Sequence, residues 1–165
     1  MLYSQGSMVK NKYKLLLLLI WIVMFTITLF NSKEKQNAKL NDLDYLVDVK
    51  TGNYWQNQIY TSKERDAHFQ GKVYGKSQTW EGAFEYCKQL NIDGIVGWEL
   101  PNKAELYQMS LLTSKYKDNP GLPHWTSTTV QDYTNLAYCL NFHGGMMMAC
   151  NKQHIAYVKC IKKVR

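Results

Sequence analysis

Cysteine and histidine are the residue types in this sequence whose spacing could do chemistry. The chain contains two Cys-x3-His pairs, Cys139 with His143 and Cys150 with His154. Two thiolates and two imidazoles form a common zinc-ligand set when they converge on one ion. On a β-strand, however, residues four apart stand about 13 Å apart, so neither pair could share an ion unless the strand breaks. The competing chemistry is oxidation of the cysteines to disulfides, which depends on the compartment.

The N-terminal segment predicts that compartment. Sixteen residues without a charge, Leu15 to Phe30, follow three closely spaced lysines, which is the pattern of an export signal. No small residues stand just after Phe30 where a signal peptidase would require them, so we favour an uncleaved anchor over a cleaved signal peptide. As a helix the segment would span only about 24 Å, so we expect thinning of the bilayer or snorkelling of Lys14 and Lys33.

These features predict the organisation of the chain. We expect a basic cytoplasmic segment at 1–14, a transmembrane signal anchor at 15–31, a polar linker at 32–43 and one folded domain at 44–165. The lysines place the domain on the periplasmic or extracellular side of a bacterial cell membrane. In that oxidising compartment Cys87, Cys139, Cys150 and Cys160 predict two disulfides, and we expect no metal or cofactor.

A predicted hairpin pairs the cysteines. If Gly144 and Gly145 form a two-residue loop between strands at 136–143 and 146–150, then His143 faces Met146 and Cys139 lies opposite Cys150. Their Cα atoms would then be about 5.5 Å apart, within disulfide range, although a bulge could shift the register. Cys87 and Cys160 remain to pair with each other.

The alternation of side chains along this hairpin separates two faces. One face resembles core and carries Tyr138, Leu140, Phe142, Met147 and Ala149. The other face carries the cysteine pair together with a candidate ligand surface, which consists of Asn141, His143, Met146 and Met148. The alternatives are that His143 is a polar residue flanking the turn and that the methionines fill the core.

The remaining elements predict an α+β fold with two helices and a small antiparallel sheet. A helix at 79–90 begins at a Thr79 N-cap and places Cys87 on its apolar stripe, and a second helix follows Asn102, whose spacing to Glu105 is that of a capping box. Further strands are expected at 45–49, 53–55, 125–130 and 155–161. Residues 56–78 show no periodicity and predict a long loop.

The distribution of charge argues against nucleic-acid binding. The net charge of +7 falls to +4 when residues 1–31 are set aside, because 17 basic residues then face 13 acidic ones. These charges are scattered singly, without the basic stripe and interleaved aromatic residues that nucleic-acid binding requires. We therefore expect no nucleic-acid partner, although weak attraction for acidic polysaccharides is compatible with the charge.

Six short segments resemble the Lcl C-terminal domain family. They are similar, in order, to the family pattern TGLxWQ, WxxAxxYC, WRLPTxxEL, YWSST, FxxG and VRCVR, at Thr51–Gln56, Trp80–Cys87, Trp98–Leu106, Trp125–Thr128, Asn141–Gly144 and Val158–Lys162. The resemblance covers roughly residues 45 to 165. Two departures are Glu99, where the family has arginine, and the lysines at 159 and 162 in place of two further arginines.

This resemblance implies a C-type-lectin-like fold in which a helix cysteine is bonded to the last strand and a second bridge crosses the later strands. It thus implies the same pairing, Cys87 with Cys160 and Cys139 with Cys150. Calcium-dependent lectins bind the ion through Glu-Pro-Asn-like and Trp-Asn-Asp motifs. Leu100 interrupts the first and the second does not occur, so calcium-dependent sugar binding is not expected, and Trp80, Trp98 and Trp125 are predicted core residues.

The sequence as a whole predicts a membrane-anchored exported recognition module that binds a glycan or protein, as an adhesin does, without catalysis. One alternative is an oxidase, since formylglycine-generating enzymes resemble C-type lectins in fold and use paired cysteines. Another alternative is a structural subunit of a cell-envelope complex. We find no Ser-His-Asp set, phosphate-binding loop or dense carboxylate cluster that would indicate another enzyme class.

Overall fold

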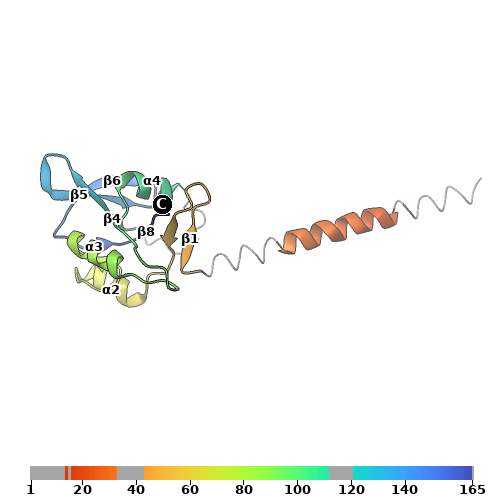
Figure 1. Cartoon of the computed structure of the whole chain (residues 1–165), viewed down its shortest axis with the longest axis horizontal. Helices are drawn as coiled ribbons and strands as arrows, with labels where there is room; N and C mark the ends of the chain where they lie inside the picture. The colour runs from red at the N-terminus through yellow and green to blue at the C-terminus, as the bar shows by residue number, and fades with distance from the viewer. Residues whose placement is uncertain (1–13, 15, 33–42, 112–120, 165) are drawn as a thin grey trace, which may run out of the picture. The chain divides into compact units, whose positions relative to one another are not determined.

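The computed structural model describes residues 14, 16–32, 43–111 and 121–164, which divide into two compact units, Met1–Asp42 and Leu43–Arg165. Residues 16–32 of the first unit are helical (Figure 1). Within the described ranges, no helix combines the length and the apolar composition needed to cross a membrane. Most of the predicted cytoplasmic segment, residues 1–13, and most of the predicted linker, residues 33–42, lie outside the described residues.

The second unit is an α+β domain, as predicted. Its described helices are α2 (Ser62–Phe69), α3 (Trp80–Gln89) and α4 (Lys103–Ser110). A three-stranded sheet has the order β1 (Tyr45–Val47), β2 (Tyr54–Gln56), β8 (Ile161–Lys162). A five-stranded sheet has the order β3 (Ser77–Gln78), β7 (Ala156–Tyr157), β4 (Pro123–Val130), β5 (Tyr133–Asn141), β6 (Met146–Asn151). The pairs are antiparallel except for β4 with β7.

The two predicted helices are confirmed, together with the caps that start them. The Thr79 side chain accepts a hydrogen bond from the backbone N–H of Gly82 at the start of α3. At α4 the capping box is complete, because the Asn102 side chain accepts from the Glu105 N–H and the Glu105 carboxylate accepts from the Asn102 N–H. Each cap satisfies backbone donors that the first helical turn leaves without partners.

The prediction of a loop over residues 56–78 is wrong, because this segment contains α2. Only Ala67 provides a buried apolar contact along the helix, so the segment lacks the apolar stripe that predicts a helix. A capping box between Thr61 and Glu64 begins α2 instead. Thr61-x-x-Glu64 is therefore the local sequence signal for this helix, since apolar periodicity does not reveal it.

The predicted last strand, 155–161, is also corrected. It is divided into β7, which pairs in the five-stranded sheet, and β8, which pairs with β2 in the other sheet. Between them the backbone N–H of Val158 donates to the carbonyl of Lys76, and Cys160 exchanges its hydrogen bonds with Gln56. The strand divides because its two ends have different partners.

The predicted hairpin exists, but its register differs by two residues. Asn141 faces Met146, so the loop has four residues, Phe142 to Gly145, instead of the two expected glycines. The reason is that Phe142 turns into the core while the Asn141 side chain accepts a hydrogen bond from the N–H of His143. Cys139 consequently lies opposite Met148, not opposite Cys150.

Helices α3 and α4 cover opposite faces of the five-stranded sheet. Neighbouring residues of β5 belong to different core clusters: Cys139 packs with α3 residues such as Ala83, whereas Leu140 packs with Leu106 and Met109 of α4. Adjacent side chains on a strand point to opposite faces, so the two clusters lie on either side of the sheet. Trp98 and Trp125 are buried in the first cluster, as predicted, and Trp80 packs at its edge.

Both predicted disulfides are confirmed. Cys87 of α3 is joined to Cys160, whose Cα atom lies 5.6 Å away, and Cys139 is joined to Cys150 at a Cα distance of 6.0 Å. The second bridge runs diagonally across the hairpin because of the shifted register. All four cysteines are thus in disulfides, and neither Cys-x3-His pair supplies a thiolate to zinc.

We predict that the two bridges contribute unequally to stability. Replacing Cys87 and Cys160 together by alanine should lower the free energy of unfolding by about 4 kcal/mol, since the bridge closes a long loop. The double replacement at Cys139 and Cys150 should cost about 3 kcal/mol, because that loop is shorter. Denaturant unfolding of each variant measures the difference. A larger loss from the hairpin bridge would contradict this order.

Candidate functional site

The predicted ligand surface does not remain one exposed group in the structure. Met148 is half-buried and packs against the core cluster of α3, so it has the core role that we considered as the alternative. Met146 and His143 are exposed at the end of the hairpin, and Asn141 is half-buried beside them. The hairpin end, defined as Asn141, His143 and Met146, is therefore the part of the prediction that is accessible to a ligand.

Packing against neighbours positions the hairpin end. A Cβ atom at Gly145 would stand 3.5 Å from the Ser110 hydroxyl and 3.9 Å from the Tyr107 ring, so the loop lies against the last turn of α4. Within the described residues, no group of three or more His, Cys, Asp or Glu side chains is arranged to hold a metal ion. The chemistry available at the hairpin end is hydrogen bonding and apolar contact.

A cleft that the sequence did not predict lies on the other side of α4. Its volume is about 490 Å³, within the usual range for small-ligand pockets. One wall is the turn between β1 and β2, and the other is the outer face of α4, where Ala104, Gln108 and Leu111 recur at helical spacing. Trp55, Met109 and Ile161 form an apolar floor. The cleft is therefore mostly apolar, with polar groups on both walls.

Hydrogen bonds within the β1–β2 turn hold the first wall in place. The Asp48 carboxylate accepts from the Thr51 hydroxyl at 2.7 Å and from the Lys50 N–H at 3.0 Å. The Thr51 hydrogen bond is the main cause that keeps the pKa of Asp48 below its usual value. Gly52 has a φ of 73° and donates its N–H to the Asp48 carbonyl, a conformation that glycine adopts without strain. The turn is ordered before any ligand arrives.

An ion-pair network fixes the second wall. Lys163, which follows β8, contacts the Glu105 carboxylate at 2.9 Å and the Glu99 carboxylate at 3.0 Å. The hydrogen bond to Glu105, assisted by Glu99, raises the pKa of Lys163. Glu99 is the residue that replaces the arginine of the family pattern, so here a carboxylate at this position binds a lysine after the last strand. The network joins the start of α4 to β8 below the cleft.

Several groups remain available to a ligand on the walls. The side-chain oxygen Oδ1 of Asn53 accepts from the N–H of Val164, and the side-chain amide hydrogens of Asn53 are not used in that bond. The Gln108 amide and the Lys50 ammonium are exposed and form no hydrogen bond or ion pair within the described residues. These donors and acceptors above an apolar floor suit a ligand that has both polar and apolar groups.

Three of the six family-like segments meet at this cleft. Thr51, Asn53 and Trp55 come from the first segment, Glu105 comes from the segment that starts α4, and Ile161 comes from the last. A family model, the Lcl C-terminal domain, matches residues 44–162. The chain belongs to the Lcl C-terminal domain family. A comparison with curated proteins gave no match.

The cleft brings together Lcl C-terminal domain segments that lie far apart in the sequence. Strand alternation predicts the hairpin face because it depends only on residues that are neighbours in the sequence. A cleft between residue 51 and residue 108 depends on a tertiary contact that no periodicity describes. The family motifs were the available signal, although their order does not reveal which ones are adjacent in space.

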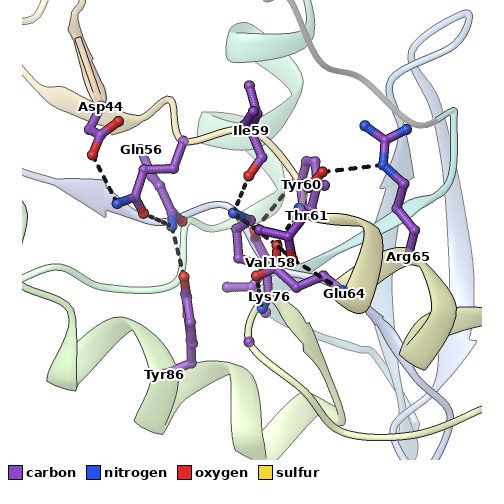
Figure 2. Close-up of polar contacts among 12 residues, drawn as sticks. Asp44, Gln56, Ile59, Tyr60, Thr61, Glu64, Arg65, Lys76, Tyr86 and Val158 are labelled. Atoms are coloured by element: carbon purple, nitrogen blue, oxygen red, sulfur yellow. Dashed lines mark hydrogen bonds and ion pairs between the residues drawn. The ribbon is translucent and has the colours of Figure 1, made fainter.

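A second polar cluster is buried between β2, α2 and α3, and Figure 2 shows its side chains pointing toward one another. The Lys76 ammonium stands 3.3 Å from the Glu64 carboxylate and donates to the Ile59 carbonyl at 2.6 Å. Glu64 also accepts from the backbone N–H groups of Lys76 and Thr61, both at 2.8 Å. Burial acts to raise the pKa of Glu64, but these hydrogen bonds outweigh it and the net shift is downward.

This cluster holds α2 to the domain and is not accessible to a ligand. Both side chains of the Lys76–Glu64 pair are more than nine-tenths buried. On the β2 side, the Gln56 amide donates to the Tyr86 hydroxyl at 2.9 Å, and burial raises the pKa of Tyr86 to about 12 (Figure 2). Breaking a buried ion pair of this kind costs about 3–5 kcal/mol, so we assign the cluster a structural role.

His124 is buried in the same region and is neutral in the folded protein. Its Nε2 atom lies 2.7 Å from the Tyr60 hydroxyl and its Nδ1 atom lies 2.8 Å from the Leu122 carbonyl. Nδ1 must carry the proton, since a carbonyl can only accept, and Nε2 then accepts from Tyr60. Burial, with a smaller contribution from the Lys159 charge, lowers the pKa of His124 to about 3.

We predict that His124 makes the domain less stable in mild acid. Between about pH 6.5 and pH 3 the unfolded histidine takes up a proton and the folded one does not, so stability falls as the pH falls. The slope should be roughly 1 kcal/mol per pH unit from this residue. In His124→Gln the slope between pH 6.5 and 4.5 should become smaller, leaving the contribution of half-buried His68, whose pKa burial also lowers.

The exposed His143 provides the matched control. His143→Gln removes an exposed imidazole, so the comparison separates loss of the buried ring from loss of any histidine. Thermal unfolding of the three proteins over this pH range measures the effect. An equal slope in His124→Gln and the parent protein would contradict the assignment.

Proposed function

We propose that this protein is an exported, membrane-tethered recognition module with a C-type-lectin-like domain. The domain binds a short segment of a glycan or a protein in the cleft between the β1–β2 turn and α4, without calcium and without chemical conversion. The cleft is the observation that carries this proposal. It offers an apolar floor, hydrogen-bonding walls and an ordered turn, and ordering before binding lowers the entropic cost of association.

The lectin-like assignment is supported by the disulfide pattern. A helix cysteine bonded to the last strand segment and a second bridge across β5 and β6 are what the family resemblance implies. The hairpin end lies against the last turn of α4, and α4 also forms a wall of the cleft.

The tether is supported by the sequence of the first unit. Residues 15 to 30 carry no charge and follow three lysines, and apolar side chains occupy all sides of the helix at 16–32. Export would also explain how four cysteines come to be joined in two disulfides, since such bridges persist in oxidising compartments. We place the domain on the outer side of a bacterial cell membrane.

The oxidase alternative requires accessible cysteine chemistry. Cys87, Cys139 and Cys160 are fully buried, and only Cys150 is partly exposed. A redox-active pair needs an accessible, activated thiolate. The burial of these sulfur atoms favours a structural role for both bridges and hence the recognition proposal.

We predict that filling the cleft weakens ligand binding. Residues 40–165 are first screened on glycan and peptide arrays to identify a ligand. Ala104→Trp should then weaken its affinity by about tenfold or more, because the indole occupies the space between the walls. The melting temperature should stay unchanged, since Ala104 is exposed.

Gln89→Trp, which adds an indole at an exposed position of α3, is the control and should bind normally. Normal binding by Ala104→Trp would exclude the cleft.

We predict that the tether depends on the apolar segment. Replacing Ile22 and Val23 by lysine should release the chain from membranes, because each central lysine opposes insertion by about 3 kcal/mol. Asn37→Lys, beyond the segment, should remain bound. Alkaline extraction of membranes from expressing cells separates the two outcomes. Retention of the doubly charged variant would disprove the tether.

A further inference from the structure

Four large apolar side chains are exposed around α2. Ile59 precedes the helix and is 64% exposed, Phe69 ends it and is 76% exposed, and Val73 and Tyr74 follow it at 57% and 49%. Phe69 is the most exposed aromatic ring among the described residues of this unit. Exposing such side chains to water is unfavourable, so a concentration of them within one segment indicates a surface that meets another phase or partner.

Hydrogen bonds bring together the segments that carry these side chains. After α2 the chain turns back, since the N–H of Lys72 donates to the Ala67 carbonyl and the N–H of Lys76 donates to the Glu64 carboxylate. Residues 72–76 therefore run back along the helix, which lies at the periphery of the domain (Figure 1). The Lys76 ammonium reaches the Ile59 carbonyl, which places Ile59 near the start of α2.

Cations accompany the apolar side chains. Lys63 and Lys72 are exposed and form no ion pair within the described residues, and Arg65 is also exposed while its Nε atom donates to the Tyr60 carbonyl. Glu64 is buried against Lys76, which leaves Asp66 as the exposed acid of α2. Apolar and aromatic side chains next to lysines match the interface of a bilayer with anionic headgroups.

We propose that this α2 surface, defined as Ile59, Lys63, Phe69, Lys72, Val73 and Tyr74, docks on an anionic lipid bilayer. The lysines contact the headgroups while Phe69, Val73 and Tyr74 enter the interfacial layer. The proposal rests on the tether of the proposed function, which keeps the domain close to the membrane. Ten residues, 33–42, separate the helix at 16–32 from the domain and can reach at most about 35 Å, comparable to the width of the domain.

Docking would also fix the orientation of the cleft relative to the membrane. Phe69 and Tyr74 belong to α2 and the segment after it, whereas the cleft is formed by α4 and the β1–β2 turn. The lipid contact and ligand contact therefore use different elements, so both can be made at once. A docked domain would present its ligand site at one orientation to the membrane.

The test compares the full-length chain in nanodiscs of phosphatidylcholine alone and of phosphatidylcholine mixed with phosphatidylglycerol. Hydrogen exchange is followed by mass spectrometry in peptides from residues 59–76. Exchange should slow by about threefold or more in the anionic discs, because lipid contact excludes water and orders the segment. High salt should reverse much of this protection, since screening weakens the headgroup contacts.

Matched variants locate the contact. Lys72→Glu and Phe69→Ser should each lose the protection, whereas Lys88→Glu and Tyr133→Ser, which change exposed residues elsewhere on the domain, should keep it. Equal exchange in both discs would overturn the docking and leave the surface to a protein partner, with the tether intact. If the chain does not stay with either disc, the tether and the docking both fail.

Discussion

The path of the segment Ala156 to Ile161 is the constraint on which the rest of the structure depends. All six residues are more than nine-tenths buried. Its first part pairs with β3 and contacts β4, its middle is bonded to α3 through the Cys87–Cys160 bridge, and its end pairs with β2. One short stretch therefore joins two sheets and a helix, and each part of the domain is placed by reference to it.

Polar groups of this segment are also buried. The hydrogen bonds that they need determine which elements pack beside the segment. Lys159 donates to the Gln56 carbonyl at 3.1 Å, the Gln56 side chain accepts from the Cys160 N–H, and the Gln56 amide then reaches Tyr86 on α3. Buried polar groups are costly unless they are hydrogen-bonded. The closed network of bonds explains why β2, rather than another strand, lies beside the last segment, and it brings Trp55 under the cleft.

The same packing also determines which surface elements are held in place and which side chains are exposed. The β1–β2 turn and α4 are held by the Asp48 hydrogen bonds and by the Lys163 ion pairs, so the cleft is rigid where a ligand would need it. Helix α2 is fastened from below by Glu64 and Lys76, and its outer side keeps Phe69 in water. The interior contacts that position each element thus also decide which of its side chains remain exposed.

Several features of this protein could be predicted from short stretches of its sequence. Thr79, Asn102 and Glu105 predicted the starts of α3 and α4, since capping involves only neighbours within one helical turn. The cysteine pairing also followed from the sequence, even though the register behind it was wrong by two residues. A diagonal pair on a hairpin is still close enough to bridge, so the conclusion tolerated the error.

Tertiary structure decided the rest. Helix α2 exists because Glu64 caps it and binds Lys76, a contact between residues twelve apart that no apolar period reveals. The last strand divides because its ends meet partners from different sheets, and Phe142 lengthens the hairpin loop because the core has room for its ring. The helix caps and the Cys139–Cys150 pairing could be predicted from the sequence alone, because each depends on residues close together in the chain. The cleft could not, because its walls come from segments that meet only when the core has assembled.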